Sequence, residues 1–98
     1  MVQILQSTTF QRWLSGLKDR RAAARIQARL DRAAGGNLGD VKPLRDGVAE
    51  MRIDHGPGYR LYYMRRGPLL ILLLAGGDKR TQQADIERAI QIAQDWRD

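Results

Sequence analysis

The stretch GVAEMRIDHGPGYRLYYMRRGPLLILLLAGGDKRT, residues 47–81, decides the fold. It predicts three β-strands, at residues 48–54, 59–65 and 69–75, each rich in β-branched, aromatic or aliphatic side chains. Between them stand the glycine- and proline-containing segments HGPG and RRGP, which are typical of tight turns. Three consecutive strands with short connections predict an antiparallel meander.

Side chains alternate across a strand, so each predicted strand has two faces. One face of the first two strands is apolar and is expected to pack on a core. The third strand is apolar on both faces, which predicts a buried central strand. The opposite face of the first two strands is polar and is expected to lie open: Glu50, Arg52, Asp54, Arg60 and Tyr62. Because folding does not require charges there, we expect this face to carry the function.

Composition bounds the class of protein. The chain has 98 residues, 29% charged and 43% hydrophobic, as expected of one globular domain spanning residues 1–98. It has no cysteine, which excludes disulfide and thiolate chemistry, and its single histidine argues against a histidine-rich metal site. No apolar run approaches the roughly 20 residues of a membrane span, and the first residues lack a secretory signal pattern. We therefore expect a cytoplasmic protein without a membrane segment, a metal or a cofactor.

The net charge of +6 is concentrated in the first two-thirds of the chain. A polyanion is a natural partner for such a surface. An acidic protein surface is a second possible partner, and a simply solvated basic surface is the third interpretation.

Three helices are expected around the meander. A short strand at residues 2–5 leads to a first helix, in which Phe10, Trp13, Leu14 and Leu17 recur at i, i+3, i+4 and i+7. A second helix is predicted over residues 19–34, ending at a glycine pair, and a third follows Thr81. Residues 37–46 read as a loop. The class is therefore α+β, with a four-stranded antiparallel sheet in the order β-α-α-β-β-β-α.

The second helix carries a row of arginines: Arg21, Arg25, Arg29 and Arg32. They are either a solvated face or a contact surface for nucleic acid or an acidic partner. Lys42 and Arg45, in the following loop, are expected next to the open sheet face.

Three motifs in order resemble one known family: E-M-R-I at residues 50–53, G-P-G-Y-R-L-Y-Y at 56–63 and G-G-D-K-x-T-Q-x-x-D-I at 76–86. Together they are similar to the HigB-like, phage-derived addiction module killer branch of the RelE/ParE toxin superfamily. The resemblance covers nearly the whole chain, including the order of elements.

The resemblance implies a compact α+β, RelE-like toxin that a helix-turn-helix antitoxin neutralises. Many members cut messenger RNA on the translating ribosome without a metal, as the RNA 2′-hydroxyl attacks the adjacent phosphate. Other members poison DNA gyrase and cut no RNA. A third possibility is an inactive module that acts only in repression with its antitoxin.

The resemblance also implies site residues. Arg60, Arg52, Lys79 and Arg80 match basic positions of RNA-cleaving relatives, and Arg60 is the expected phosphate clamp because a guanidinium presents a planar fork to phosphate oxygens. Tyr62 is expected to stack on an RNA base. Basic residues of the helices, loops and strand ends are expected to bind RNA or the ribosome: Arg21, Arg25, Arg29, Arg32, Lys42, Arg45, Arg65 and Arg66.

The proton-transfer groups are less defined. Several relatives carry a tyrosine or histidine after the last strand, and this sequence has neither beyond Tyr63. Glu50 or Lys79 is therefore the expected proton carrier. His55 has a side chain suited to proton transfer, but it lies in a turn, where a lone histidine is more often solvated.

Overall fold

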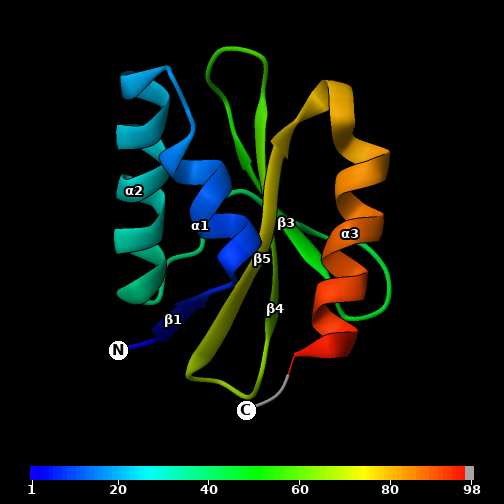
Figure 1. The fold of residues 1–98 in the computed structure, drawn as a ribbon. Helices are drawn as coiled ribbons and strands as arrows, with labels where there is room; N and C mark the ends of the chain where they lie inside the picture. The colour runs from blue at the N-terminus through cyan, green and yellow to red at the C-terminus, as the bar shows by residue number, and fades with distance from the viewer. Residues whose placement is uncertain (97–98) are drawn as a thin grey trace.

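The computed structural model describes residues 1–96, which form a five-stranded sheet with helices on both faces (Figure 1). The strands lie in the order β1-β5-β4-β3-β2. Their bounds are β1 (Gln3–Gln6), β2 (Val41–Pro43), β3 (Ala49–Ile53), β4 (Tyr59–Arg65) and β5 (Leu70–Asp78). The helices are α1 (Thr8–Ser15), α2 (Arg20–Ala34) and α3 (Gln82–Asp95), with a 3₁₀ turn at Lys79–Thr81 before α3.

The α+β class is confirmed, but the expected four-stranded antiparallel sheet is wrong. The sheet has a fifth strand, β2, inside the segment expected to be a loop, and β2 pairs antiparallel with β3. It was missed because a three-residue edge strand containing a proline has no alternating pattern. The sheet is also mixed, since β1 runs parallel to β5 with Gln3 opposite Leu70.

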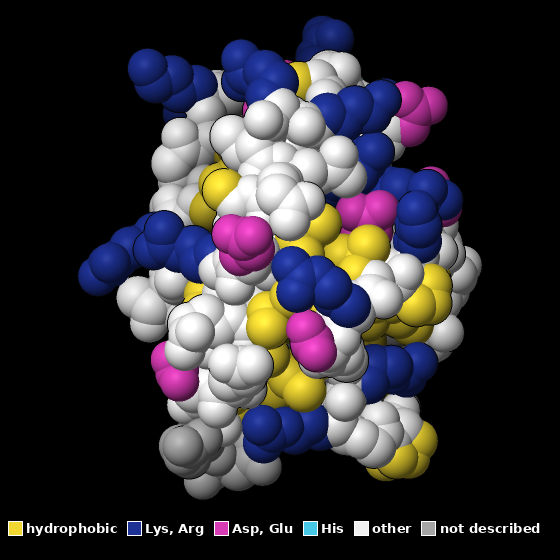
Figure 2. All heavy atoms as spheres, turned by 90° about the vertical axis from the view of Figure 1, so that its right-hand side faces the viewer, with side chains coloured by type: hydrophobic (Ala, Val, Ile, Leu, Met, Phe, Trp, Pro, Cys, Tyr) yellow, Lys and Arg dark blue, Asp and Glu magenta, His cyan; other side chains and the backbone are white. Residues whose placement is uncertain are grey.

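Helices cover both faces of the sheet. On the α1 and α2 side, Phe10, Ile26 and Leu30 pack against residues of β3, β4 and β5 in one core. On the other side, Ala89 and Ile90 of α3 pack on β4 and β5 in a second core. Figure 2 looks onto the α3 side and shows hydrophobic side chains among basic groups. The sheet face expected to be open is therefore partly covered.

Polar side chains cap the N-termini of the first two helices. The hydroxyl of Ser7 accepts a hydrogen bond from the backbone N–H of Phe10 at 2.9 Å and so caps α1. Asp19 caps α2 by accepting from the backbone N–H groups of Arg21 and Ala22. Gly35 follows the last residue of α2, as expected. Within residues 1–96, no helix combines the length and apolar character that a membrane crossing requires.

Two glycines at the end of β5 let helices approach from both faces. A Cβ on Gly76 would collide with the indole of Trp13 in α1, and one on Gly77 would collide with the carboxylate of Asp85 in α3. Asp85 also accepts a hydrogen bond from the hydroxyl of Thr81. The G-G-D-K-x-T-Q-x-x-D motif thus seats α1 and α3 on β5, and this packing places Lys79 at the strand end.

Candidate active site

A polar pocket of about 280 Å³ opens where β3 ends, β4 begins and β5 ends. Arg52 and Arg60 lie directly opposite each other in the β3–β4 register. Three of the four basic residues predicted for catalysis meet here, together with two carboxylates, and the lining is Asp40, Arg52, Ile53, Asp54, Gly58, Arg60 and Lys79.

Arg60 is the most deeply buried cation of this pocket. Only 12% of its side chain is exposed. Its Nη1 donates to the carbonyl of Tyr59 at 3.1 Å, and its Nε lies 3.7 Å from Oε2 of Glu50. A guanidinium fixed in this way loses little conformational entropy when it binds a phosphate.

Glu50 does not lie on an open face, so that expectation is wrong. The residue is 3% exposed, behind Arg60. Its carboxylate forms the ion pair with Arg60 and accepts a hydrogen bond from Nε2 of Gln82, at the start of α3, at 3.4 Å. It was misplaced because alternation along β3 gives the face of a side chain but not the helix that covers it. Glu50 orients Arg60 and does not line the pocket.

Arg52 forms an ion pair with Asp40, with Nη2 donating to Oδ1 at 2.7 Å and Nε donating to the same carboxylate at 3.2 Å. This ion pair was not foreseen, because Asp40 comes alongside Arg52 only through the pairing of β2 with β3. The hydrogen bond from Arg52 lowers the pKa of Asp40 below its usual value. The pair therefore stays charged at neutral pH, and a phosphate must compete with Asp40 for Arg52.

Lys79 reaches the pocket across Gly58, in the turn between β3 and β4. Gly58 has φ 80°, and a Cβ there would stand 2.8 Å from Cε of Lys79. Arg80, the fourth predicted residue, does not line the pocket. Its side chain is 82% exposed, and its Nη2 lies 3.1 Å from Oδ2 of Asp78, whose pKa its hydrogen bonds lower.

Asp54 is a carboxylate of the pocket, and the alternation along β3 predicted it on the same face as Arg52 without indicating a role. It is exposed, and it forms no ion pair or side-chain hydrogen bond within the described part of the chain. Its signal was the i, i+2 spacing from Arg52. Asp40 had no such signal, because its place depends on the pairing of β2 with β3.

His55 does not line the pocket. Its Nε2 lies 3.3 Å from Oδ2 of Asp19 and ties the β3–β4 turn to the start of α2. Interaction with His55 contributes to the lowered pKa of Asp19, after the larger effect of the backbone hydrogen bond from Ala22. This histidine therefore positions the turn.

Tyr62 is fully buried under α3, with 0% exposure, so the expectation that it stacks on RNA is wrong. Burial raises the pKa of its phenol, and the charge of Glu50 adds to that shift. Its hydroxyl has no hydrogen-bond partner among residues 1–96. A buried, unsatisfied hydroxyl destabilises the fold.

We therefore expect Tyr62→Phe to raise the free energy of unfolding by about 1 kcal/mol, because the substitution removes the unsatisfied hydroxyl and keeps the ring. Urea denaturation of both proteins measures this. A Tyr62→Phe protein with a lower free energy of unfolding than the wild type would contradict an unsatisfied hydroxyl at this position.

The other predicted RNA-binding residues are scattered. Arg29 points inward and donates to backbone carbonyls, so it is a structural residue. Arg65 donates to the carbonyl of Pro68, and Arg66 donates to the carbonyl of Trp96. The remaining predicted residues lie exposed on α2, on β2 and in the β2–β3 loop: Arg21, Arg25, Arg32, Lys42 and Arg45.

Fold and pocket together define a small α+β protein with a mixed sheet and a cation-lined pocket at its strand ends. No family model matches the chain. An uncharacterized protein of Haemophilus influenzae is 49% identical over 94 residues, which cover 96% of this chain and 95% of that relative. The chain belongs to the same family as that protein.

Proposed function

We propose that this protein is a toxin of the RelE/ParE type, HigB-like, and that it cuts messenger RNA on the translating ribosome. The observation that carries the proposal is the convergence of Arg52, Arg60 and Lys79 on one pocket. These residues come from three separate motifs that the sequence shares with that superfamily. Their side chains provide the positive charge that phosphoryl transfer requires.

The chemistry uses the RNA itself. The 2′-oxygen attacks the adjacent phosphorus, the bond from phosphorus to the 5′-oxygen breaks, and the products carry a 2′,3′-cyclic phosphate and a 5′-hydroxyl. Arg60 and Arg52 bind the non-bridging oxygens, where negative charge accumulates in the transition state. No metal or cofactor takes part in this scheme.

Two protons must move for this reaction to balance. We assign Asp54 as the group that accepts the proton of the 2′-hydroxyl, because its carboxylate lines the pocket without a cationic partner in residues 1–96. We assign Lys79 as the donor to the departing 5′-oxygen, since its ammonium carries the protons and reaches the same pocket. Much of the rate would come from the ribosome holding the messenger RNA in line for attack.

The proposal includes a helix-turn-helix antitoxin as the neutralising partner and the cytoplasm as the place of action. The experiment is a short induction of this chain in bacteria, followed by mapping of new RNA 5′ ends. Cuts should appear inside translated regions and should be absent from a reporter message whose start codon has been removed. Growth arrest without new RNA ends would contradict the proposal and favour a gyrase poison, detected as trapped DNA breaks. An absence of arrest would favour an inactive repression module.

A further inference from the structure

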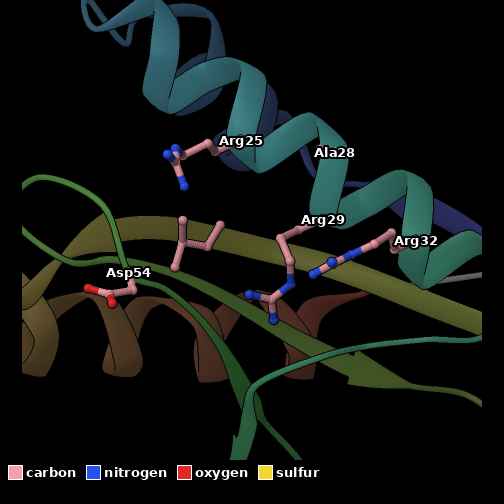
Figure 3. Close-up of a pocket in the computed structure, with 6 residues that line it drawn as sticks. Arg25, Ala28, Arg29, Arg32 and Asp54 are labelled. Carbon is pink, nitrogen blue, oxygen red and sulfur yellow. The ribbon is translucent and has the colours of Figure 1, made fainter.

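A second cleft, of about 350 Å³, lies between α2 and the end of β3 (Figure 3). Three arginines of α2 enter it at i, i+4 and i+7, which is one helical face. Figure 3 shows Arg29 reaching from the helix toward the sheet, with Arg25 and Arg32 on either side of it and Asp54 on the turn side. The lining is Arg25, Ala28, Arg29, Arg32, Ile53 and Asp54.

Arg29 builds the floor of this cleft. Its Nη1 donates to the carbonyl of Arg52 at 2.7 Å, and its Nη2 donates to the carbonyls of Leu38 at 2.9 Å and Asp40 at 3.1 Å. It thus fixes α2 against the segments that carry the pocket of Arg52, Arg60 and Lys79, called the catalytic pocket below. Burial lowers the pKa of Arg29, and the nearby charge of Arg32 lowers it further. Positive charge is therefore crowded in this cleft.

The side chains of Arg25 and Arg32 do not hold α2 against the sheet as Arg29 does. Neither forms an ion pair or a hydrogen bond from its side chain within residues 1–96, and both are exposed. The cleft holds three guanidinium groups and one carboxylate, that of Asp54. Its excess positive charge would be relieved by a bound anion.

The cleft and the catalytic pocket are neighbours, because Ile53 and Asp54 line both of them. We propose that one RNA strand occupies both: its scissile phosphate lies in the catalytic pocket, and a phosphate further along the same strand lies between Arg25 and Arg32. The strand crosses the end of β3. The identity of this ligand rests on the proposed function.

RNA fits the pair of pockets better than an acidic protein segment does, for two reasons. The same ligand must satisfy two adjacent cationic pockets, and a nucleic acid strand carries a charge on every nucleotide. The cleft also offers apolar surface from Ala28 and Ile53 beside guanidinium planes, and unstacked bases rest on such surfaces. This cleft therefore extends the bound length of RNA beyond the cleaved dinucleotide.

The test measures binding of purified protein to oligouridylates of two, four and eight nucleotides with 2′-O-methyl groups, which prevent cleavage. Affinity is measured against salt concentration by fluorescence anisotropy, and by NMR shifts for the dinucleotide. The variants are Arg25→Ala with Arg32→Ala for the cleft, and Arg60→Gln with Glu50→Gln for the catalytic pocket. Arg88→Ala, on α3, is the control because it removes one exposed charge on the opposite face of the sheet.

The cleft variant should bind the octanucleotide about tenfold or more weakly, and the slope of log K against log salt should fall by about 0.7, the value for one lost phosphate contact on a single strand. It should bind the dinucleotide normally. Unchanged octanucleotide binding, or an equal loss in Arg88→Ala, would overturn the inference. A cleft variant that keeps its RNA affinity but loses binding of polyglutamate would also overturn the inference. That result would indicate an acidic protein partner. Failure of the proposed function would give a different result. The Arg60→Gln, Glu50→Gln variant would then bind oligouridylates of every length as tightly as the wild type does.

Discussion

Replacing Arg60 with glutamine should abolish growth arrest and slow ribosome-dependent RNA cleavage by about 100-fold or more. Arg60 combines three properties that the other cations of the pocket do not share. It is nearly buried, it is held by the carbonyl of Tyr59, and Glu50 orients it from behind. Its charge therefore acts from a fixed position with little competing water. The measurement is the single-turnover rate of cleavage on programmed ribosomes.

This variant needs a control for folding, since it leaves Glu50 buried beside a neutral side chain. Combining Arg60→Gln with Glu50→Gln removes both charges and should restore much of the stability without restoring activity. Arg88→Gln should keep full activity, because Arg88 is exposed on α3, away from the catalytic pocket. An Arg60→Gln protein that folds and still cleaves at the normal rate would remove Arg60 from the mechanism.

Replacing Glu50 with alanine should lower the free energy of unfolding by about 3 kcal/mol, which is roughly 15 °C in Tm for a domain of this size. Glu50 is 3% exposed and is the counter-charge of Arg60. Its removal leaves a cavity and takes away the buried counter-charge of Arg60. Thermal unfolding followed by circular dichroism measures the effect.

Glu50→Gln separates stability from orientation. The amide keeps the volume of the side chain and can still accept from Gln82, so the loss of stability should be smaller. Cleavage should nevertheless slow, with the larger effect on the rate of the chemical step than on RNA binding, because the guanidinium of Arg60 remains but is less well oriented. A stability equal to that of the wild type in Glu50→Ala would contradict the buried ion pair.

The strands that frame the site could be predicted because their alternation was strong. In β4, the apolar face of Tyr59, Leu61 and Tyr63 packs on the α1 and α2 side, as expected from the period of two. The same period placed Arg52 and Arg60 on one face, where they prove to be opposite each other. Lys79 followed from the position at which the third strand was expected to end.

The rest of the site depends on contacts between distant segments. Asp40 reaches Arg52 only because β2 pairs with β3, and β2 is too short and irregular to show a pattern. Glu50 and Tyr62 were assigned to an open surface because the covering by α3 is a tertiary contact. Arg29 was grouped with its neighbours on α2, since helical spacing cannot distinguish an arginine that faces backbone carbonyls from one that faces solvent.

The measurement that tests the central claim most directly is cleavage by purified protein on ribosomes programmed with a defined message. The proposal predicts a single cut in the decoding site, an upstream fragment ending in a 2′,3′-cyclic phosphate, and loss of that product in the paired Glu50→Gln and Arg60→Gln variant. Full-length message after prolonged incubation with folded wild-type protein, or an equal yield of cut message from the paired variant, would contradict it.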